Sequence, residues 1–211
     1  MDAHQRQFSN PFSMDTACTN CAELCETRET IVHGYGDVAA EFLFIGEHPT
    51  AAAEETGVPF TGDDAGERLQ YILGELGFVR SEPTATEPDI QNAFLTYLTR
   101  CRNPDRAPTD NEIDLCEPFL NAEIRMINPQ MLVPIGDRAL KALAMDYTTT
   151  NPDSLSVEET HATTLRGRGF ELLPMSELNA QSDADTEAFI KHVMENVFSR
   201  DYRQTKGRQS R

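Results

Sequence analysis

Cysteine is the residue type in this sequence with the clearest potential for chemistry. Cys18, Cys21 and Cys25 share the segment CTNCAELC, whereas Cys101 and Cys116 are separated by 14 residues. An odd number of cysteines, in a chain that we expect to be intracellular, argues against a disulfide framework. Two thiolates at Cys-x2-Cys spacing can both reach one metal centre from a single turn of chain.

A four-cysteine iron–sulfur cluster accounts for this spacing best. Cys18 and Cys21 supply one pair of ligands, and Cys101 and Cys116 are the candidates for the second pair. A zinc ribbon would offer a second Cys-x2-Cys pair, and the wide separation instead favours a larger group such as a 4Fe–4S cluster. One structural zinc or buried free thiols are the alternatives. Cys25 is either a spare thiol or a replacement for Cys18 or Cys21.

Alternating strand and helix patterns predict the framework that would position these cysteines. The predicted strands are 41–47, 93–99, 131–136 and 170–175, and the predicted helices are 63–76, 109–127, 137–145 and a last one carrying Phe189, Ile190, Val193, Met194, Val197 and Phe198. The polar residues 146–168 predict a loop or insertion. This order predicts an α/β fold, a three-layer α/β/α domain with a four-stranded parallel sheet and an N-terminal cysteine-bearing arm.

Ligands of such a sheet bind beyond the carboxyl ends of its strands. The segments that lie there are GEHPTAAAEETGVPF after the first strand, TRCRNPDRAP after the second, the turn Gly136–Arg138 after the third and MSELNAQ after the fourth. We therefore expect the functional side chains to come from these four segments.

Long stretches of the chain resemble the iron–sulfur family 4 enzymes of the uracil-DNA glycosylase superfamily. GEHPTAAAEETGVPFTGDDAGERL is similar to that family's Gly-Glu-x-Pro-Gly and Gly-x-Pro-Phe-x-Gly motifs, and RCRNPDRAPTDNEIDLCEPFL is similar to its Cys-Arg-Pro-Pro region. Cys18-x2-Cys21 followed by VHGYGDVAAEFLFIGE resembles its cluster arm and first strand. The resemblance covers roughly residues 18–145. It implies a 4Fe–4S cluster on Cys18, Cys21, Cys101 and Cys116, and binding of a flipped base.

The resemblance also implies a pocket for the base. Phe60 matches the family's stacking phenylalanine, and Gly46 and Glu47 match its first motif, in which Glu47 would hold or polarise water. His48 stands where the family usually has a small residue and is a candidate donor or base. A plain core role for Phe60, and a surface or structural role for His48, are the alternatives.

Two positions depart from the family pattern. Tyr97 stands at the family's base-reading asparagine, and Glu177 stands at the histidine expected after the last strand. A carboxylate cannot donate a hydrogen bond to a departing uracil anion unless it is protonated. Asn179 is close enough in sequence to offer an amide. Three functions are therefore open: a divergent glycosylase for uracil or another deaminated base, a non-catalytic DNA- or base-binding protein, and a cluster protein with a regulatory or redox role.

The charge of the chain bears on its partner and its solvent. The chain has 35 acidic and 18 basic side chains, a net charge of −17, and only three of the basic residues are lysines. A polyanion is a poor first candidate for nucleic-acid binding. Acidic side chains dispersed along the chain, together with few lysines, suit a protein in concentrated salt, so we interpret the charge as an adaptation to salt, as in a halophile, with an acidic-surface function as the alternative. Phosphate contacts are expected from Arg102, Arg106 and Arg138, with Arg100 and the basic tail completing a positive face. Surface ion pairing is the alternative role.

The sequence also predicts how the chain is organised. We expect residues 1–17 to be a flexible lead-in, 18–199 a single glycosylase-like domain and 200–211 a basic tail. Neither an apolar run that could cross a membrane nor an apolar N-terminal stretch is present. We therefore expect a cytoplasmic monomer that has uracil-containing or otherwise damaged DNA as its partner and makes no contact with membranes.

Overall fold

A six-stranded sheet forms the centre of the computed structural model, which describes residues 8–199. Its strand order is β1-β3-β2-β4-β6-β5. The strands are β1 (Tyr35–Gly36), β2 (Phe42–Gly46), β3 (Ala93–Tyr97), β4 (Met131–Pro134), β5 (Leu165–Arg166) and β6 (Glu171–Leu172). The neighbours β3, β2, β4 and β6 are parallel, which confirms the predicted four-stranded parallel sheet. β1 and β5 add an antiparallel strand at each edge.

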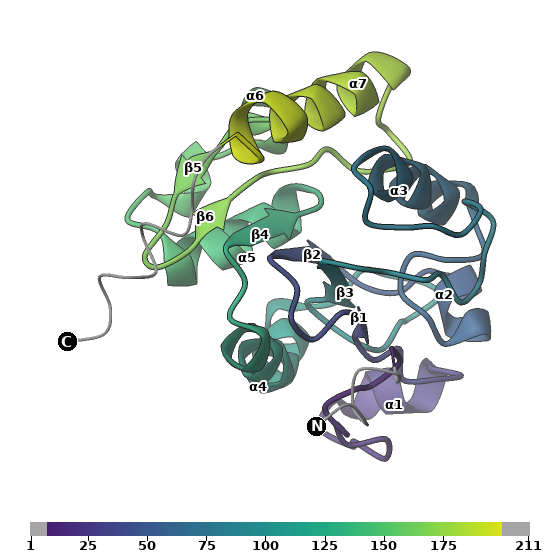
Figure 1. Ribbon diagram of the computed structural model, residues 1–211. Helices are drawn as coiled ribbons and strands as arrows, with labels where there is room; N and C mark the ends of the chain where they lie inside the picture. Colours follow the sequence, from purple (N-terminus) through teal and green to yellow (C-terminus); the bar gives the residue numbers. More distant parts are fainter. Residues whose placement is uncertain (1–7, 200–211) are drawn as a thin grey trace.

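Helices cover both faces of this sheet. They are α1 (Ala22–Thr27), α2 (Ala51–Thr56), α3 (Asp64–Glu75), α4 (Asp110–Ile127), α5 (Asp137–Tyr147), α6 (Val157–Thr160) and α7 (Asp183–His192), with a 3-10 turn η1 (Pro152–Ser154) and a π-helical segment η2 (Val193–Val197). Figure 1 shows α3 and α7 on one side of the sheet, α4 on the other and α1 beside the N-terminus. The predicted three-layer α/β/α architecture is confirmed.

The alternation of side chains along β2 explains the two helical layers. Phe44 belongs to the same buried cluster as Leu69 of α3 and Phe189 of α7. The next residue, Ile45, belongs to the cluster that contains Ile124 of α4 and Leu140 of α5. Because successive strand residues point to opposite faces, a strand covered on both sides is apolar along its whole length.

Side-chain caps fix where the longer helices begin. The Thr109 hydroxyl accepts the Glu112 N–H at 3.3 Å, and the Glu112 carboxylate accepts the Thr109 N–H at 2.8 Å. This capping box confirms the predicted start of α4. Asp63 is the residue directly before α3, and its carboxylate caps the helix by accepting the Gly66 N–H at 2.8 Å.

The short elements differ from the sequence prediction. Periodicity does not reveal α1, α2, β1 or β5, since two to six residues carry too little pattern. Residues 146–168, predicted as a loop, contain η1, α6 and β5. β6 is shorter than the predicted strand 170–175 because Pro174 has no N–H to donate to the ladder. Pairing resumes only at a bridge between Met175 and Ile135.

The first described residues lie along the sheet edge. Ser9 forms a bridge with Tyr35, and the Gly36 N–H donates to the Phe8 carbonyl at 3.0 Å. Part of the expected lead-in is therefore paired with β1, while residues 1–7 and the predicted basic tail at 200–211 lie outside the described residues. Within residues 8–199, no helix has both the length and the apolar character that crossing a membrane requires.

Candidate functional site

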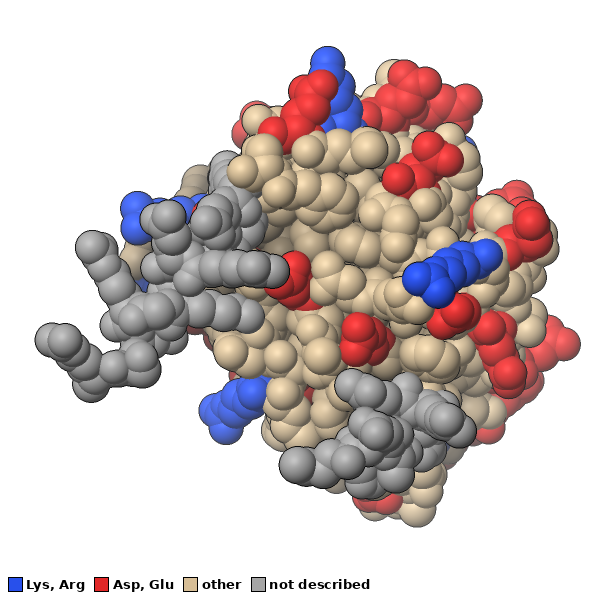
Figure 2. Space-filling model, viewed as in Figure 1, with Lys and Arg blue, Asp and Glu red and all other residues tan. Residues whose placement is uncertain are grey.

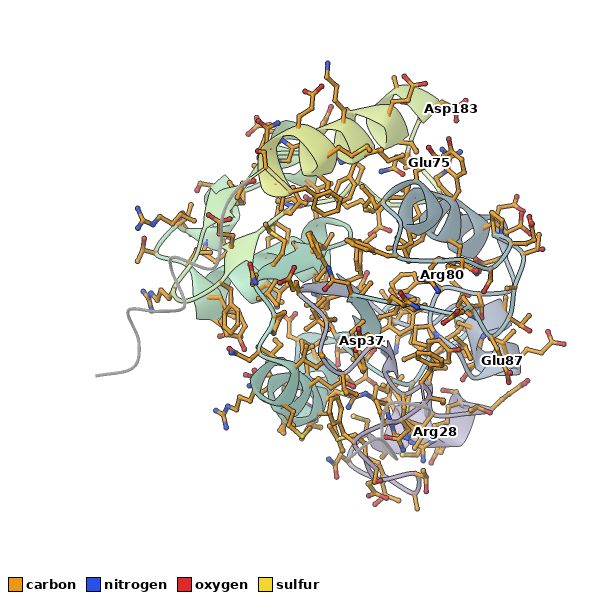
Figure 3. The ribbon with its side chains drawn as sticks, in the orientation of Figure 1. Arg28, Asp37, Glu75, Arg80, Glu87 and Asp183 are labelled. Carbon is orange, nitrogen blue, oxygen red and sulfur yellow. The ribbon has the colours of Figure 1, made fainter. Side chains whose placement is uncertain are left out.

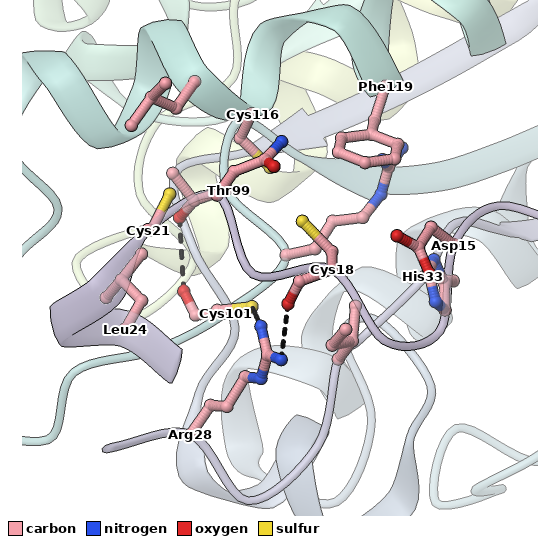
Figure 4. A pocket seen from close by; sticks show the side chains of 14 residues that line it. Asp15, Cys18, Cys21, Leu24, Arg28, His33, Thr99, Cys101, Cys116 and Phe119 are labelled. Atoms are coloured by element: carbon pink, nitrogen blue, oxygen red, sulfur yellow. Dashed lines mark hydrogen bonds between the residues drawn. The ribbon is translucent and has the colours of Figure 1, made fainter. Parts of the chain in front are cut away.

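The four cysteines predicted as cluster ligands line one hollow beside the sheet. Cys21 is the N-cap of α1, Cys18 lies three residues before it, Cys101 follows β3, and Cys116 lies on α4. Figure 4 shows their four sulfur atoms on different sides of the hollow. Segments nearly 100 residues apart in sequence therefore meet where α1 packs against α4 and against the loop that follows β3.

Burial and neighbouring sulfur atoms raise the pKa of three cysteines in this hollow, Cys21, Cys101 and Cys116. The pKa of Cys21 is raised to about 11, first by burial and then by the thiolates of Cys116 and Cys101. Burial likewise raises the pKa of Cys101 and of Cys116. Thiols arranged this way gain stability when a positive centre binds their ionised form. The donor set therefore fits a metal–sulfur group.

Arg28 connects two of the cysteine-bearing segments. Its Nη1 donates to Cys101 Sγ at 3.3 Å, and its Nη2 donates to the Cys18 carbonyl at 2.6 Å. Figure 4 shows the guanidinium at the edge of the hollow, between these two residues. Sequence reasoning did not single out Arg28, although its position three residues after Cys25 was the available signal. The guanidinium supplies positive charge beside the sulfur atoms.

Cys25 occupies a different position from the other cysteines. It lies on α1, its Sγ is 3.6 Å from the Cys18 carbonyl, and it is absent from the described lining of the hollow. Within residues 8–199, no three His, Cys, Asp or Glu side chains are close enough together to hold a single metal ion.

A second pocket lies at the carboxyl ends of the parallel strands, where the sequence predicted ligand binding. Its lining includes Gly46, Glu47, His48, Phe60 and Asn179, the five residues predicted for base binding and catalysis. The cavity has a volume of about 170 Å³ and opens to solvent. The fold therefore places all five of these residues around one cavity.

Phe60 is held in an unusual backbone conformation. Its φ of 54° is in the left-handed region, which costs of order 1–3 kcal/mol for a residue with a side chain. The Phe60 N–H donates to the Tyr97 hydroxyl at 2.9 Å, and the two ring centroids are 4.6 Å apart. Tyr97 is only 2% exposed. The residue at the family's base-reading position thus supports Phe60 and forms a wall of the pocket.

Two glycines make room for this aromatic pair. A Cβ on Gly46 would lie 2.8 Å from Phe60 Cζ and 2.9 Å from Tyr97 Cδ1. A Cβ on Gly66 would lie 2.6 Å from the Phe60 carbonyl oxygen. Gly46 therefore serves the pocket through its lack of a side chain, which lets the Phe60 ring lie against the end of β2.

The pocket lining contains three carboxyl groups, those of Glu47, Asp63 and Glu177, and the imidazole of His48. His48 Nδ1 lies 2.9 Å from the Pro49 carbonyl oxygen, which can only accept, so Nδ1 is the donor and Nε2 is the ring nitrogen that this hydrogen bond leaves open. Glu177 lies at the pocket mouth with part of its side chain open to solvent. Burial of the rest raises its pKa, and the charges of Glu47 and Asp137 raise it further.

The three arginines expected at DNA phosphates are all engaged in ion pairs. Arg102 lies 3.4 Å from Glu54. Arg106 contacts Glu23 and, at 2.7 Å, Glu112, while Arg138 contacts Asp110. These contacts correspond to the alternative role of surface ion pairing, and the structure brings none of the three into the lining of the base pocket.

Arg100 is not part of any positive face. Its side chain is 3% exposed and lies 2.8 Å from the equally buried Glu123 of α4, and its guanidinium lies 5.0 Å from the Phe119 ring centre. The expectation that Arg100 faces DNA is therefore wrong. The physical reason is that Phe119 and Glu123, both on α4, enclose Arg100 in the segment after β3, and a buried guanidinium needs a counterion.

Comparisons with a family model and with individual proteins point to the same family. The model of the uracil DNA glycosylase superfamily matches residues 33–197. A type-4 uracil-DNA glycosylase of Saccharolobus solfataricus is 35% identical over 121 residues, which cover 56% of this chain and 50% of that protein. The type-4 enzyme of Thermotoga maritima is 35% identical over 124 residues, covering 58% of each chain. A type-5 uracil-DNA glycosylase of Thermus thermophilus is 32% identical over 153 residues, covering 63% of this chain and 69% of that protein. The chain thus spans 50% and 58% of the length of these two type-4 relatives.

Proposed function

This chain belongs to the uracil-DNA glycosylase superfamily, and we propose that it excises uracil or another deaminated base from DNA by hydrolysing the N-glycosidic bond. The observation that carries this proposal is the single pocket at the strand ends, which combines Phe60, Glu47, His48 and Asn179. A flipped base needs an aromatic wall, a polar group to read its edge and a route for water. We expect the protein to act in the cytoplasm as a monomer.

The proposed reaction assigns one task to each side chain. The Phe60 ring contacts the face of the base, and the Asn179 amide offers both a donor and an acceptor to its edge. Glu47, or the free Nε2 of His48, takes a proton from the water whose oxygen bonds to C1′ of the sugar. The bond from C1′ to the base nitrogen breaks, and its electron pair leaves with the base.

Excision from a uracil-containing oligonucleotide tests the proposal. Wild-type protein should release uracil from single- or double-stranded DNA over a range of salt concentrations, and Glu47→Gln should lower the rate about 10²–10⁴-fold if Glu47 acts as base. Glu55→Gln is the matched control, because Glu55 is exposed on α2 outside the pocket. Release at the same rate by both variants would refute the role of Glu47, and no release by wild type would refute the activity.

Two features favour the alternative of a non-catalytic base-binding protein. Tyr97 forms a buried wall of the pocket where the family places an asparagine, and Glu177 stands at its histidine position. A binding protein would retain uracil-containing DNA without releasing the base. Tight binding of such DNA with no product after prolonged incubation would select this alternative.

We propose that Cys18, Cys21, Cys101 and Cys116 hold a 4Fe–4S cluster. When bound, such a cluster supplies metal–sulfur bonds that fasten the N-terminal arm to the β3 loop and α4. Purified protein should contain about four iron and four sulfide ions per chain and absorb near 400 nm. Cys116→Ala should lose both, whereas Cys25→Ala should retain them. One zinc ion and no iron per chain would support the zinc alternative instead.

We propose that Arg102, Arg106 and Arg138 contact DNA phosphates by exchanging or sharing their present carboxylate partners. Each guanidinium already has a carboxylate partner, so a phosphate must replace or share that partner. Each arginine that contacts a phosphate should contribute about one unit to the slope of log affinity against log salt. If replacing one of these arginines by alanine leaves this slope unchanged, that arginine does not contact a phosphate and serves only in its ion pair.

A further inference from the structure

Glu177 occupies a position in the pocket that catalysis by Glu47 alone leaves unexplained. It lies on the segment between β6 and α7, and its carboxyl group packs directly over Gly136, where a Cβ would overlap it. Gly136, with φ of 85°, is the N-cap of α5. The fold therefore keeps this position free of a side chain and leaves room for the Glu177 carboxyl group at the pocket mouth.

The surroundings of Glu177 are predominantly acidic. The charges of Glu47, directly after β2, and of Asp137, at the start of α5, both act on its carboxyl group, and Glu47, Asp63 and His48 line the same pocket. His161 lies behind the segment: its Nδ1 accepts the Ser176 N–H at 2.9 Å, and its Nε2 lies 2.9 Å from the Asp185 carbonyl.

Few groups favour an ionised Glu177. The first turn of α5 would attract an anion, but Asp137 already places a carboxylate there and accepts the Val157 N–H at 2.6 Å. Among residues 8–199, no donor makes a hydrogen bond to the Glu177 carboxyl group. Partial burial and two carboxylate neighbours without a donor are the conditions under which one member of a carboxyl pair keeps its proton.

We propose that Glu177 is the acid of this pocket, which holds a proton and donates it to the departing base, while Glu47 remains the ionised partner. The inference rests on the proposed function for its substrate and deepens it by assigning the donor. A protonated carboxyl group is a hydrogen-bond donor, whereas its anion would only repel the electron-rich leaving group.

The proposed step is balanced in atoms and charge. The bond from C1′ to the base nitrogen breaks and its electron pair goes to the base, which receives the Glu177 proton. Water bonds to C1′ and loses a proton to Glu47. Glu177 ends ionised and Glu47 protonated, and exchange with solvent restores both groups before the next turnover.

The pH dependence of excision by two Glu177 variants tests this assignment. Wild-type activity should fall about tenfold per pH unit once the pH exceeds the pKa of Glu177, because the acid form is consumed. Glu177→Gln retains an N–H donor that does not titrate, so its lower activity should lack that decline. Glu177→Ala should lose about 10²–10⁴-fold. Glu187→Gln, on the exposed face of α7, is the matched control and should behave as wild type.

A second measurement does not depend on catalysis. In protein with 13C-labelled glutamate, the carboxyl signal missing from Glu177→Gln should titrate above the ordinary glutamate pKa, and Glu47→Gln should move that midpoint to lower pH. Binding of an oligonucleotide containing 2′-fluoro-2′-deoxyuridine, which resists hydrolysis, should weaken as pH rises through the same midpoint in wild type and not in Glu177→Gln.

The outcomes separate the two proposals. An ordinary or lowered Glu177 midpoint, or a pH profile shared by wild type and Glu177→Gln, overturns the assignment of Glu177 even if uracil is excised. A raised midpoint with pH-dependent binding but no excision by wild type supports Glu177 as donor to a bound base and overturns the proposed hydrolysis.

Discussion

At the scale of single residues, the base pocket depends on how closely Phe60 and Tyr97 approach the end of β2. Tyr97 supplies the acceptor for the Phe60 N–H and so holds Phe60 at a positive φ. Gly46 allows the two rings to lie against the backbone. The strain at Phe60 is therefore balanced by a specific hydrogen bond and by packing that only glycine permits.

Gly46→Ala should impair binding in the pocket more than it lowers the stability of the protein. The new methyl group would meet Phe60 Cζ at 2.8 Å and Tyr97 Cδ1 at 2.9 Å, so one ring must move. We expect a loss of about 1–3 kcal/mol in the free energy of unfolding from overpacking, together with loss of uracil-DNA binding. Gly74→Ala is the control, because Gly74 is in α3 with nothing within 4 Å of its added Cβ. Equal binding by the two variants would contradict this account.

Arg28→Ala should destabilise the group held by the cysteines. The change removes the donor to Cys101 Sγ and the link to the Cys18 carbonyl. Loss of a partner of this kind typically weakens metal binding 10–100-fold. Chelator-driven loss of absorbance near 400 nm should therefore be faster than in wild type, with Arg28→Lys intermediate because lysine lacks the planar pair of donors. Arg125→Ala, exposed at the end of α4, provides the comparison. If it releases iron as fast as Arg28→Ala, the assigned role is wrong.

At the scale of elements, the start of α7 determines where the segment carrying Glu177 and Asn179 ends. The Ser182 hydroxyl accepts the Asp185 N–H at 3.2 Å, and the Ser182 N–H donates to the Asp185 carboxylate at 3.0 Å. α7 is also joined to α3 by the ion pair of Arg68 with Asp183. The segment is thus fixed between β6 in the sheet and a capped helix on its surface.

Ser182→Ala should cost about 1 kcal/mol of stability at neutral pH, since it removes an N-cap. The Ser182 hydroxyl and N–H lower the pKa of Asp185 below its ordinary 3.8. That stabilisation is complete above the ordinary pKa and is lost as pH falls through the lowered one. Urea unfolding should therefore show a difference from wild type that narrows in acid. Ser199→Ala, whose hydroxyl donates only to the Glu195 carbonyl, should show little change at any pH.

At the scale of the whole molecule, acidic side chains are spread over several elements. Figure 2 shows many more acidic than basic groups on the face viewed, and Figure 3 places Glu75, Glu87 and Asp183 on α3, the following loop and the start of α7. Arg80 is a basic side chain on the same face. With a net charge of −17, mutual repulsion should oppose the compact state at low salt.

The thermal midpoint should therefore rise between about 0.1 M and 1 M KCl, as the Debye length falls from about 10 to 3 Å. A gain of about 1 kcal/mol would raise the midpoint by roughly 2–4 °C in a chain of this size. Replacing the exposed Glu75 and Glu87 by glutamine should reduce this dependence. A midpoint that does not change with salt in wild type would contradict the interpretation of the charge as an adaptation to salt.

Local pattern was enough to predict the four parallel strands, the long helices, the capping box at Thr109 and the four candidate cysteines. These features depend on periodicity and spacing, which neighbouring residues along the chain determine. The rule that parallel strands direct their carboxyl ends to one edge predicted only the segments that meet at the site. The resemblance to the glycosylase family selected Gly46, Glu47, His48, Phe60 and Asn179 within them.

Only the tertiary structure decided which charges and rings meet. Arg100 is buried against Glu123 instead of facing DNA, Tyr97 supports Phe60, and Glu177 lines the same pocket as Glu47. Each of these contacts joins elements that are far apart in sequence. Their pairing depends on how α4 and the segment after β6 pack on the sheet, and the pattern of either element alone carries no information about its neighbour across the fold.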